Sequence, residues 1–209
     1  MASSSNGGGS TVSFGSTPQA KDDLLTAAST GLTEDSSSVA YLDVMANDLG
    51  GNAKVLWSMD NGVNNTGAMG GNIAGDLLTQ DTGRVEAVST DTSLNGARIW
   101  ITSDGKVGYD TASLSTAFRA QLQGLNDGQS LSDTFTYAIR LGNGTLSWAT
   151  ATVQLAGSND AAVISGVKAG SVVEAGGIAN GTAGTPTASG TLTDTDVDNA
   201  ANTFQAVST

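Results

Sequence analysis

The densest group of candidate metal ligands lies near the C-terminal end of the chain, in the segment Asp194-Thr195-Asp196-Val197-Asp198-Asn199. Alternate residues of an extended segment point to the same side, so Asp194, Asp196 and Asp198 are expected to converge. Three carboxylates held this close repel one another unless a cation lies between them. Calcium binds about six to eight oxygen ligands, and the pattern therefore predicts a calcium site. The alternative is that these are solvated turn residues that bind no ion.

The residue types that most enzymes use are missing or isolated in this chain. It contains no His and no Cys, which excludes His-based nucleophilic triads and the usual zinc sites. A glycosidase needs only two carboxylates, but most Asp residues lie at turn positions and no pair stands in a context that indicates acid–base catalysis. We therefore expect the protein not to be an enzyme and predict no catalytic residue.

Three tryptophans, Trp57, Trp100 and Trp148, suggest a second kind of site, a surface on which sugar rings stack. Trp100 alternates with Ile99 and Ile101, which predicts that its indole points away from the core. With the Gly- and Asn-rich segment 62–83, it makes a carbohydrate-binding module an alternative function and a cell-surface glycan an alternative partner. The plainer interpretation is that these aromatic residues are core or cross-strand partners.

Composition indicates a chain rich in strands and turns. Of its 209 residues 28 are Gly, and the 20 acidic residues are 17 Asp and only 3 Glu. Because Asp favours turns and Glu favours helices, this skew predicts an all-β protein. The net charge of −12 argues against nucleic acid as a partner, since phosphates would be repelled.

Membrane insertion is not expected, because no stretch approaches the ~18 apolar residues that a spanning helix needs. Residues 1–18 have neither a basic region nor an apolar core, which argues against a cleaved signal peptide. We interpret them as a flexible Gly/Ser leader.

Alternating apolar residues predict strands through most of the chain. The segments are residues 40–46, 55–59, 97–101, 107–109, 135–141 and 146–155. The last two flank the turn Gly142-Asn143-Gly144 and form a predicted hairpin. The return strand changes its apolar phase at Trp148, which predicts a β-bulge there. About seven strands around one core predict an immunoglobulin-like or cadherin-like Greek-key sandwich.

One segment has helical periodicity instead. Four apolar residues recur at the spacing of one helix face, namely Leu114, Phe118, Leu122 and Leu125. Ser113 is the expected N-cap and Gly124 the expected end. The sequence therefore predicts one short helical turn that plugs one end of the sandwich.

These signals divide the chain into a leader at 1–18, a complete β-sandwich module at 19–158, and the start of a second, incomplete repeat at 159–209. The last part supplies two or three strands by our interpretation, about half of what a closed sandwich needs. The tetrapeptide AVST occurs at 87–90 and again at 206–209, as suits a repeat protein. Unpaired strand edges also favour an alternative, a self-assembling filament or surface-layer subunit in which 159–209 donates strands to another copy.

The run from Asp133 to Gly166 carries a family resemblance. The matching residues are Asp133, Phe135, Tyr137, Gly142, Asn143, Gly144, Gly157, Asn159, Asp160 and Val163. In this order they resemble the end of a VCBS repeat, a cadherin-like module found in tandem in large bacterial surface proteins such as RTX-type adhesins. Leu141 and Ala162 depart from the pattern, where the family often has Asp and Pro. Residues 38–62 and 189–209 are similar to the openings of such modules.

The resemblance implies a non-catalytic module of a bacterial adhesin or biofilm-matrix protein, secreted or held at the cell surface, with neighbouring repeats or other copies of itself as partners. In such proteins calcium rigidifies the linker between modules, which points to Asn159 and Asp160, with Glu174 at the acidic position that opens the next strand. The plainer interpretation is an Asn-Asp turn. The equivalent loop of the first module, at Asn47 and Asp48, is expected to bind no ion.

Overall fold

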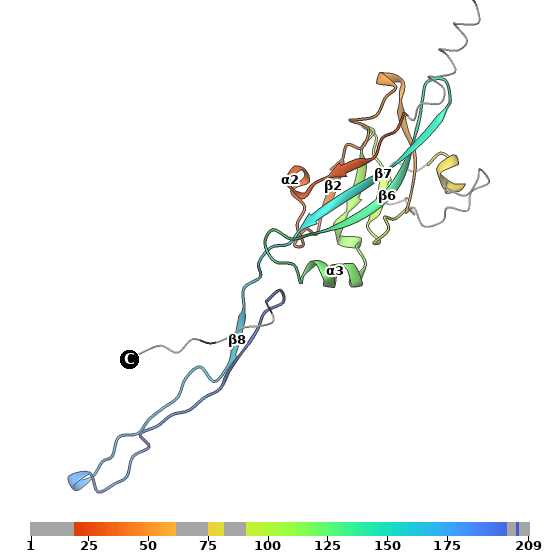
Figure 1. Cartoon of the computed structure of the whole chain (residues 1–209). Helices are drawn as coiled ribbons and strands as arrows, with labels where there is room; N and C mark the ends of the chain where they lie inside the picture. The colour runs from red at the N-terminus through yellow and green to blue at the C-terminus, as the bar shows by residue number, and fades with distance from the viewer. Residues whose placement is uncertain (1–18, 62–74, 82–90, 200–203, 205–209) are drawn as a thin grey trace, which may run out of the picture.

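The protein is all-β, as predicted, and most of its strands form two sheets (Figure 1). The computed structural model describes residues 19–61, 75–81, 91–199 and Phe204. One sheet has the order β1 (Asp23–Leu25), β7 (Leu146–Ala156), β6 (Ser130–Arg140) and β3 (Val55–Asp60). The other has the order β2 (Val39–Leu42), β5 (Val107–Asp110) and β4 (Arg98–Ile101). β1 runs parallel to β7, and the remaining pairings in these sheets are antiparallel.

The two sheets share one buried core. Its members include Ile99 from β4, Val107 from β5, Phe135 and Ile139 from β6, and Val153 from β7. Apolar residues at alternate positions of β2, β4, β5, β6 and β7 face this core, as the sequence pattern predicts. In β3 the predicted alternation of Val55, Trp57 and Met59 is wrong, because Leu56 and Met59 are the core residues and Val55 is 46% exposed.

A buried hydrogen bond joins the two sheets inside this core. The hydroxyl of Tyr109 on β5 donates to Oδ2 of Asp133 on β6 at 2.7 Å. The other carboxylate oxygen of Asp133 accepts from the backbone N–H groups of Asn95 and Thr134, at 2.9 and 2.8 Å. The fully buried carboxylate is therefore satisfied by hydrogen-bond donors without a basic side chain.

The β6–β7 hairpin is regular, so the predicted bulge at Trp148 is wrong. Its strands pair without a break from Ser130↔Ala156 to Arg140↔Leu146. Trp148 lies on the outward face of β7 and is 41% exposed. Apolar side chains near it therefore occur on both faces of the strand, while the alternation of the two faces continues unbroken. The irregularity of this sheet lies in β3, where the register shifts at Trp57.

Trp100 is buried, which corrects the expectation that it points to solvent. Only 5% of the residue is exposed, because both faces of β4 and β5 are covered. Trp100 pairs with Gly108 across these strands, and a Cβ on Gly108 would lie 2.1 Å from Cε2 of the indole. The missing side chain of Gly108 therefore makes room for the indole.

Short helical segments connect the strands: α2 (Ala27–Thr30), η1 (Gly51–Ala53), η2 (Gly75–Leu78), η4 (Thr111–Ser113), α3 (Thr116–Leu122) and η5 (Ile178–Asn180). The predicted helix corresponds to α3, which buries Phe118 and Leu122. Its N-cap is Ser115 rather than Ser113, because Ser113 belongs to η4. None of the described helices is long and apolar enough to cross a membrane.

Beyond residue 158 the chain leaves the two sheets and forms a long two-stranded ribbon (Figure 1). β8 (Val163–Gly166) pairs antiparallel with β9 (Leu192–Thr195), and two isolated bridges continue the pairing at Val173↔Thr185 and Gly176↔Thr182. Taken as whole residues, none of those described from 159 to 199 is buried. We call residues 19–158 the first unit and residues 159–199 the ribbon.

Replacing Gly108 with Ala is expected to destabilise the first unit by about 1–3 kcal/mol, because the new methyl group overlaps the Trp100 indole. Thermal unfolding followed by circular dichroism measures the change. Gly124→Ala is the control, since the nearest atom to its new Cβ would be the backbone oxygen of Gln121 at 3.7 Å. Equal melting temperatures for both variants would show that the indole does not depend on Gly108.

Candidate functional site

Carboxylates of the first unit hold the segment that leads into the ribbon. Glu34 accepts from the backbone N–H of Ser158 through Oε1 at 3.1 Å. Asp127 accepts from the N–H of Asn159 through Oδ1, also at 3.1 Å. The backbone N–H of Glu34 donates in turn to Ala156 O at 2.9 Å, which fixes this residue beside the end of β7. The linker is thus anchored from two separate loops.

Acidic residues from the ribbon meet this anchor. The N–H of Asp160 donates to Oδ2 of Asp198 at 3.2 Å. Asn126 of the first unit donates through Nδ2 to the backbone oxygen of Asp198 at 3.1 Å. Asn199 donates through Nδ2 to Oδ1 of Asn159 at 3.3 Å. We call Glu34, Asp127, Asn159, Asp160, Asp196 and Asp198 the junction cluster.

Two oxygen atoms of the junction cluster are buried without a hydrogen-bond partner, Oε2 of Glu34 and Oδ1 of Asp198. The Glu34 residue is only 4% exposed. Burial raises the pKa of its carboxyl, and the nearby charges of Asp160, Asp35 and Asp198 raise it further. The pKa of Asp198 is raised chiefly by its hydrogen bond with the Asp196 side chain, and burial adds to the rise. Both groups therefore lie where a positive charge is lacking.

The donor set of the junction cluster fits a hard cation. Carboxylate, amide and backbone oxygens are the ligands that calcium prefers, and the two orphaned oxygens need a partner. Within the described residues, no three acidic side chains already stand at the spacing of a closed metal site. An ion would therefore have to draw the side chains of the cluster inward.

The structure brings together four of the six predicted ligands, Asn159, Asp160, Asp196 and Asp198. Asp194 lies within β9 opposite Ile164 and takes no part in the hydrogen bonds that connect the cluster. Glu174 is exposed in the distal part of the ribbon, next to the Val173↔Thr185 bridge, and does not approach Asp160.

Sequence reasoning missed the two carboxylates that the first unit contributes to the junction cluster, Glu34 and Asp127. Glu34 is separated from Ser158 by 124 residues, so no local spacing connects the two. The one available signal was that Glu is rare in this chain, with 3 occurrences.

We call the opposite end of the first unit the far pole. Its charged groups are arranged differently from those of the junction cluster. The buried Tyr137 hydroxyl lies within hydrogen-bonding distance of Asp23 Oδ2 at 2.8 Å and of Val44 O at 2.9 Å. It also lies 3.2 Å from Asp48 Oδ1, which accepts from the N–H of Lys21 at 2.7 Å. Since a hydroxyl donates one proton, these oxygens compete for it. Burial raises the pKa of Asp23 to about 6, against the lowering effect of its hydrogen bond from Tyr137.

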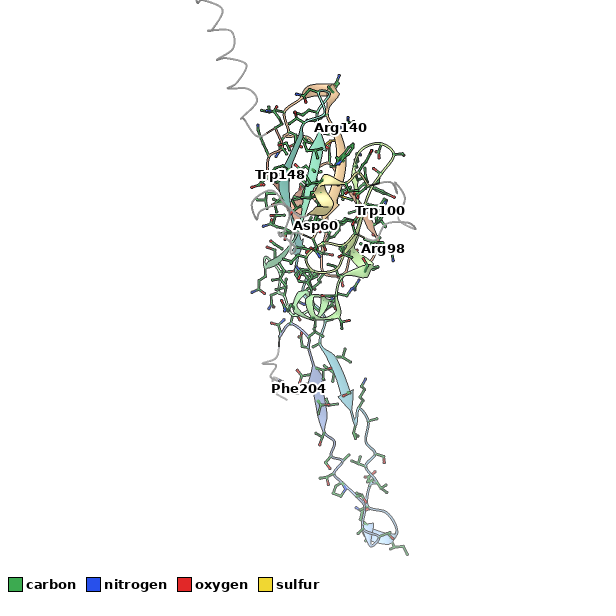
Figure 2. The ribbon with its side chains drawn as sticks, turned by 90° about the vertical axis from the view of Figure 1, so that its right-hand side faces the viewer. Asp60, Arg98, Trp100, Arg140, Trp148 and Phe204 are labelled. Atoms are coloured by element: carbon green, nitrogen blue, oxygen red, sulfur yellow. The ribbon has the colours of Figure 1, made fainter. Side chains whose placement is uncertain are left out.

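The carbohydrate alternative loses the residue on which it was based, because Trp100 is buried. Figure 2 shows Trp148 and Trp100 on different parts of the first unit, where they belong to β7 and β4. Most of the segment 62–83 lies outside the described residues. Comparison with protein-family models, curated proteins and solved structures finds no match for this chain.

The raised pKa of Asp23 predicts a pH dependence of stability. A carboxyl whose pKa rises from 3.8 to about 6 on folding contributes stability that is fully present below pH 3.8 and is lost as the pH rises through about 6. Unfolding midpoints measured from about pH 4 to pH 8 should therefore fall more steeply for the wild type than for Asp23→Asn. We expect a difference of about 1–2 kcal/mol after solvent screening at this half-exposed side chain.

The control for this measurement is Asp104→Asn, which removes an exposed carboxylate whose pKa is lowered by its hydrogen bond from Thr102. This variant should keep the wild-type slope between about pH 5 and pH 8. An unchanged slope in Asp23→Asn would mean that Asp23 is ionised throughout that range.

Proposed function

We propose that this chain is a non-catalytic repeat module of a bacterial adhesin or biofilm-matrix protein, secreted or held at the cell surface, with calcium stiffening the connection between consecutive modules. The first unit would be an immunoglobulin-like or cadherin-like Greek-key sandwich, and the ribbon the beginning of the next module. The observation that carries the proposal is the junction cluster, in which carboxylates from both parts meet around two buried, unpartnered oxygens.

A cation in the junction cluster would link parts that otherwise share few contacts. Glu34 and Asp127 belong to the first unit, whereas Asp160, Asp196 and Asp198 belong to the ribbon. When bound, calcium would offset the repulsion between these carboxylates and supply the partner that Glu34 Oε2 and Asp198 Oδ1 lack. A hinge between the two parts would then become a fixed angle.

A hydrogen bond that occurs in both parts supports the repeat interpretation. In the first unit the N–H of Lys21 donates to the carboxylate of Asp48 at 2.7 Å. In the ribbon the N–H of Asp160 donates to the carboxylate of Asp198 at 3.2 Å. The two acceptors differ in their place relative to the preceding strand, because Leu42 ends β2 whereas Leu192 begins β9. The support for a repeat is therefore the shared kind of hydrogen bond alone, from a backbone N–H before the first strand of each part to a later Asp carboxylate.

Calcium is expected to raise the melting temperature of the protein relative to excess chelator. At a hundred times its dissociation constant, a ligand that binds only the native state adds about 2.7 kcal/mol. Asp198→Asn and Glu34→Gln should each remove most of this gain, because each takes away an unpartnered charged oxygen. Asp104→Asn, a change of the same charge in an exposed turn, should retain it.

Stiffening itself is measured by small-angle X-ray scattering, with one extended shape expected in calcium and a broader set of shapes in chelator. Equal melting temperatures in millimolar calcium and in chelator would contradict the calcium proposal.

A second candidate function, assembly of copies by strand donation, is favoured by the apolar surface of the ribbon. Among its exposed residues are Val163 at 63%, Ile164 at 47%, Val172 at 60%, Val173 at 61% and Leu192 at 41%. An isolated pair of strands is marginal in water, and its free edges can pair with another sheet. In this role other copies of the chain would cover the ribbon, and a head-to-tail polymer would grow.

Deletion of residues 159–209 tests this second role. If the ribbon joins copies, light scattering over a concentration series should show polymers for the full chain and monomers for the shortened one. A double variant, Ile164→Lys with Leu192→Lys, should also give monomers while keeping the chain length, since both exposed residues lie on the ribbon. The same mass for all three proteins would rule out strand donation.

A further inference from the structure

The N-terminal segment of the first unit runs beside β7 and in the same direction. β1 pairs parallel with β7 along all of its residues. After α2 the parallel pairing resumes at Thr33↔Ala156. There the N–H of Ala156 donates to Leu32 O at 3.1 Å, and the N–H of Glu34 donates to Ala156 O at 2.9 Å. Residues 19–34 therefore lie against β7 from the far pole to the junction cluster.

Side chains at the far pole hold the start of this segment, before β1 begins. The hydroxyl oxygen of Ser147 on β7 accepts from the N–H groups of residues 19 and 20, at 3.1 and 2.9 Å. The carboxylate of Asp48 accepts from the N–H of Lys21 at 2.7 Å. The loop that carries Asp48 is itself held by Lys54, whose Nζ donates to the backbone oxygen of Asp48 at 2.5 Å. The segment is therefore hydrogen-bonded from its first described residue.

Two carboxylates of the segment add a hydrogen bond to each end of its contact with β7. Oδ1 of Asp22 accepts from the N–H of Thr150 on β7 at 2.8 Å. Oε1 of Glu34 accepts from the N–H of Ser158, just after β7, at 3.1 Å. These side-chain bonds join the same two stretches of chain as the backbone pairing does. They therefore share any force that acts between the segment and β7.

The places where the chain enters and leaves the first unit determine how tension reaches this contact. The chain enters at the far pole, where residue 19 bonds to the start of β7, and leaves at the junction cluster, where β7 ends. Figure 1 shows the end of β7 leading into the ribbon. Tension along the chain pulls residues 19–34 toward the far pole and β7 toward the junction. Because the two strands are parallel, this force slides one along the other and stretches all of their hydrogen bonds together.

We propose that residues 19–34 and β7, with the side-chain bonds of Ser147 and Asp22, form a mechanical clamp that resists unfolding when the chain is pulled from both ends. The inference rests on the proposed function for the source of the tension, since a surface module is pulled through its neighbours. Its action is separate from calcium, because the hydrogen bonds of the clamp do not use the two unpartnered oxygens of the junction cluster. Resistance to force is then a property of the first unit itself.

The test pulls single molecules of the full chain in two directions from the same N-terminal handle. The chain has no Cys, so one introduced Cys gives a unique second attachment point. In Ala161→Cys this point lies just beyond the first unit, and pulling slides residues 19–34 along β7. In Thr145→Cys it lies in the exposed β6–β7 turn, beside the entry of the chain, and pulling peels the same strands apart from one end. Because peeling breaks the bonds one after another, Ala161→Cys should unfold at the higher force at equal loading rate.

Two serine variants, each combined with Ala161→Cys, test the side-chain part of the clamp. Ser147→Ala removes the acceptor of two N–H groups and should lower the unfolding force. Ser132→Ala removes an exposed hydroxyl from β6, outside the clamp, and should retain the force of Ala161→Cys alone. If Ser147→Ala does not fold, Asp22→Ala takes its place, since it removes the acceptor of the Thr150 N–H from an exposed position.

All pulling is done in excess chelator, so that its outcome does not depend on the junction cluster. Equal unfolding forces for the two attachment points would overturn the inference, and so would equal forces for the clamp variant and Ser132→Ala. A higher force for Ala161→Cys in a protein whose melting temperature ignores calcium would support the clamp and count against the calcium proposal alone.

Discussion

The shortage of positive charge is the constraint on which the rest of this structure depends. The chain must place 20 carboxylates with only 8 Lys and Arg side chains and no His. Buried carboxylates are costly unless each finds donors. Asp133 is satisfied by the Tyr109 hydroxyl and two backbone N–H groups. The Tyr137 hydroxyl lies within hydrogen-bonding distance of both Asp23 and Asp48 and donates its one proton to one acceptor at a time. Two buried tyrosine hydroxyls thus supply hydrogen bonds to carboxylates that would form salt bridges in a more basic protein.

The two ends of the first unit differ in whether their carboxylates find enough hydrogen-bond donors. At the far pole, hydroxyl and ammonium donors converge on Asp48 and its loop. At the junction, the described donors leave Oε2 of Glu34 and Oδ1 of Asp198 without a partner. Since that deficit lies between the first unit and the ribbon, filling it with a cation would change how the two parts are held relative to each other. The stiffening role proposed above rests on this location between the two parts.

The ribbon presents a second problem, which is its exposed apolar surface. None of its described residues is buried, although several are large and apolar. Such a surface is stable only when other strands cover it, whether they come from the same module or from another copy.

The sequence by itself determined the all-β class, the core-facing positions of the long hairpin and the acidic segment near the C-terminus, because alternation and turn composition are local properties. It also indicated Asp194, Asp196 and Asp198 as one candidate site and Asn159, Asp160 and Glu174 as another, whereas the structure brings Asn159, Asp160, Asp196 and Asp198 together. Only the tertiary structure decided that Trp100 is buried over Gly108, that Glu34 joins the junction, and that Glu174 does not. These outcomes depend on residues far apart in the chain, which become neighbours only when the sheets pack.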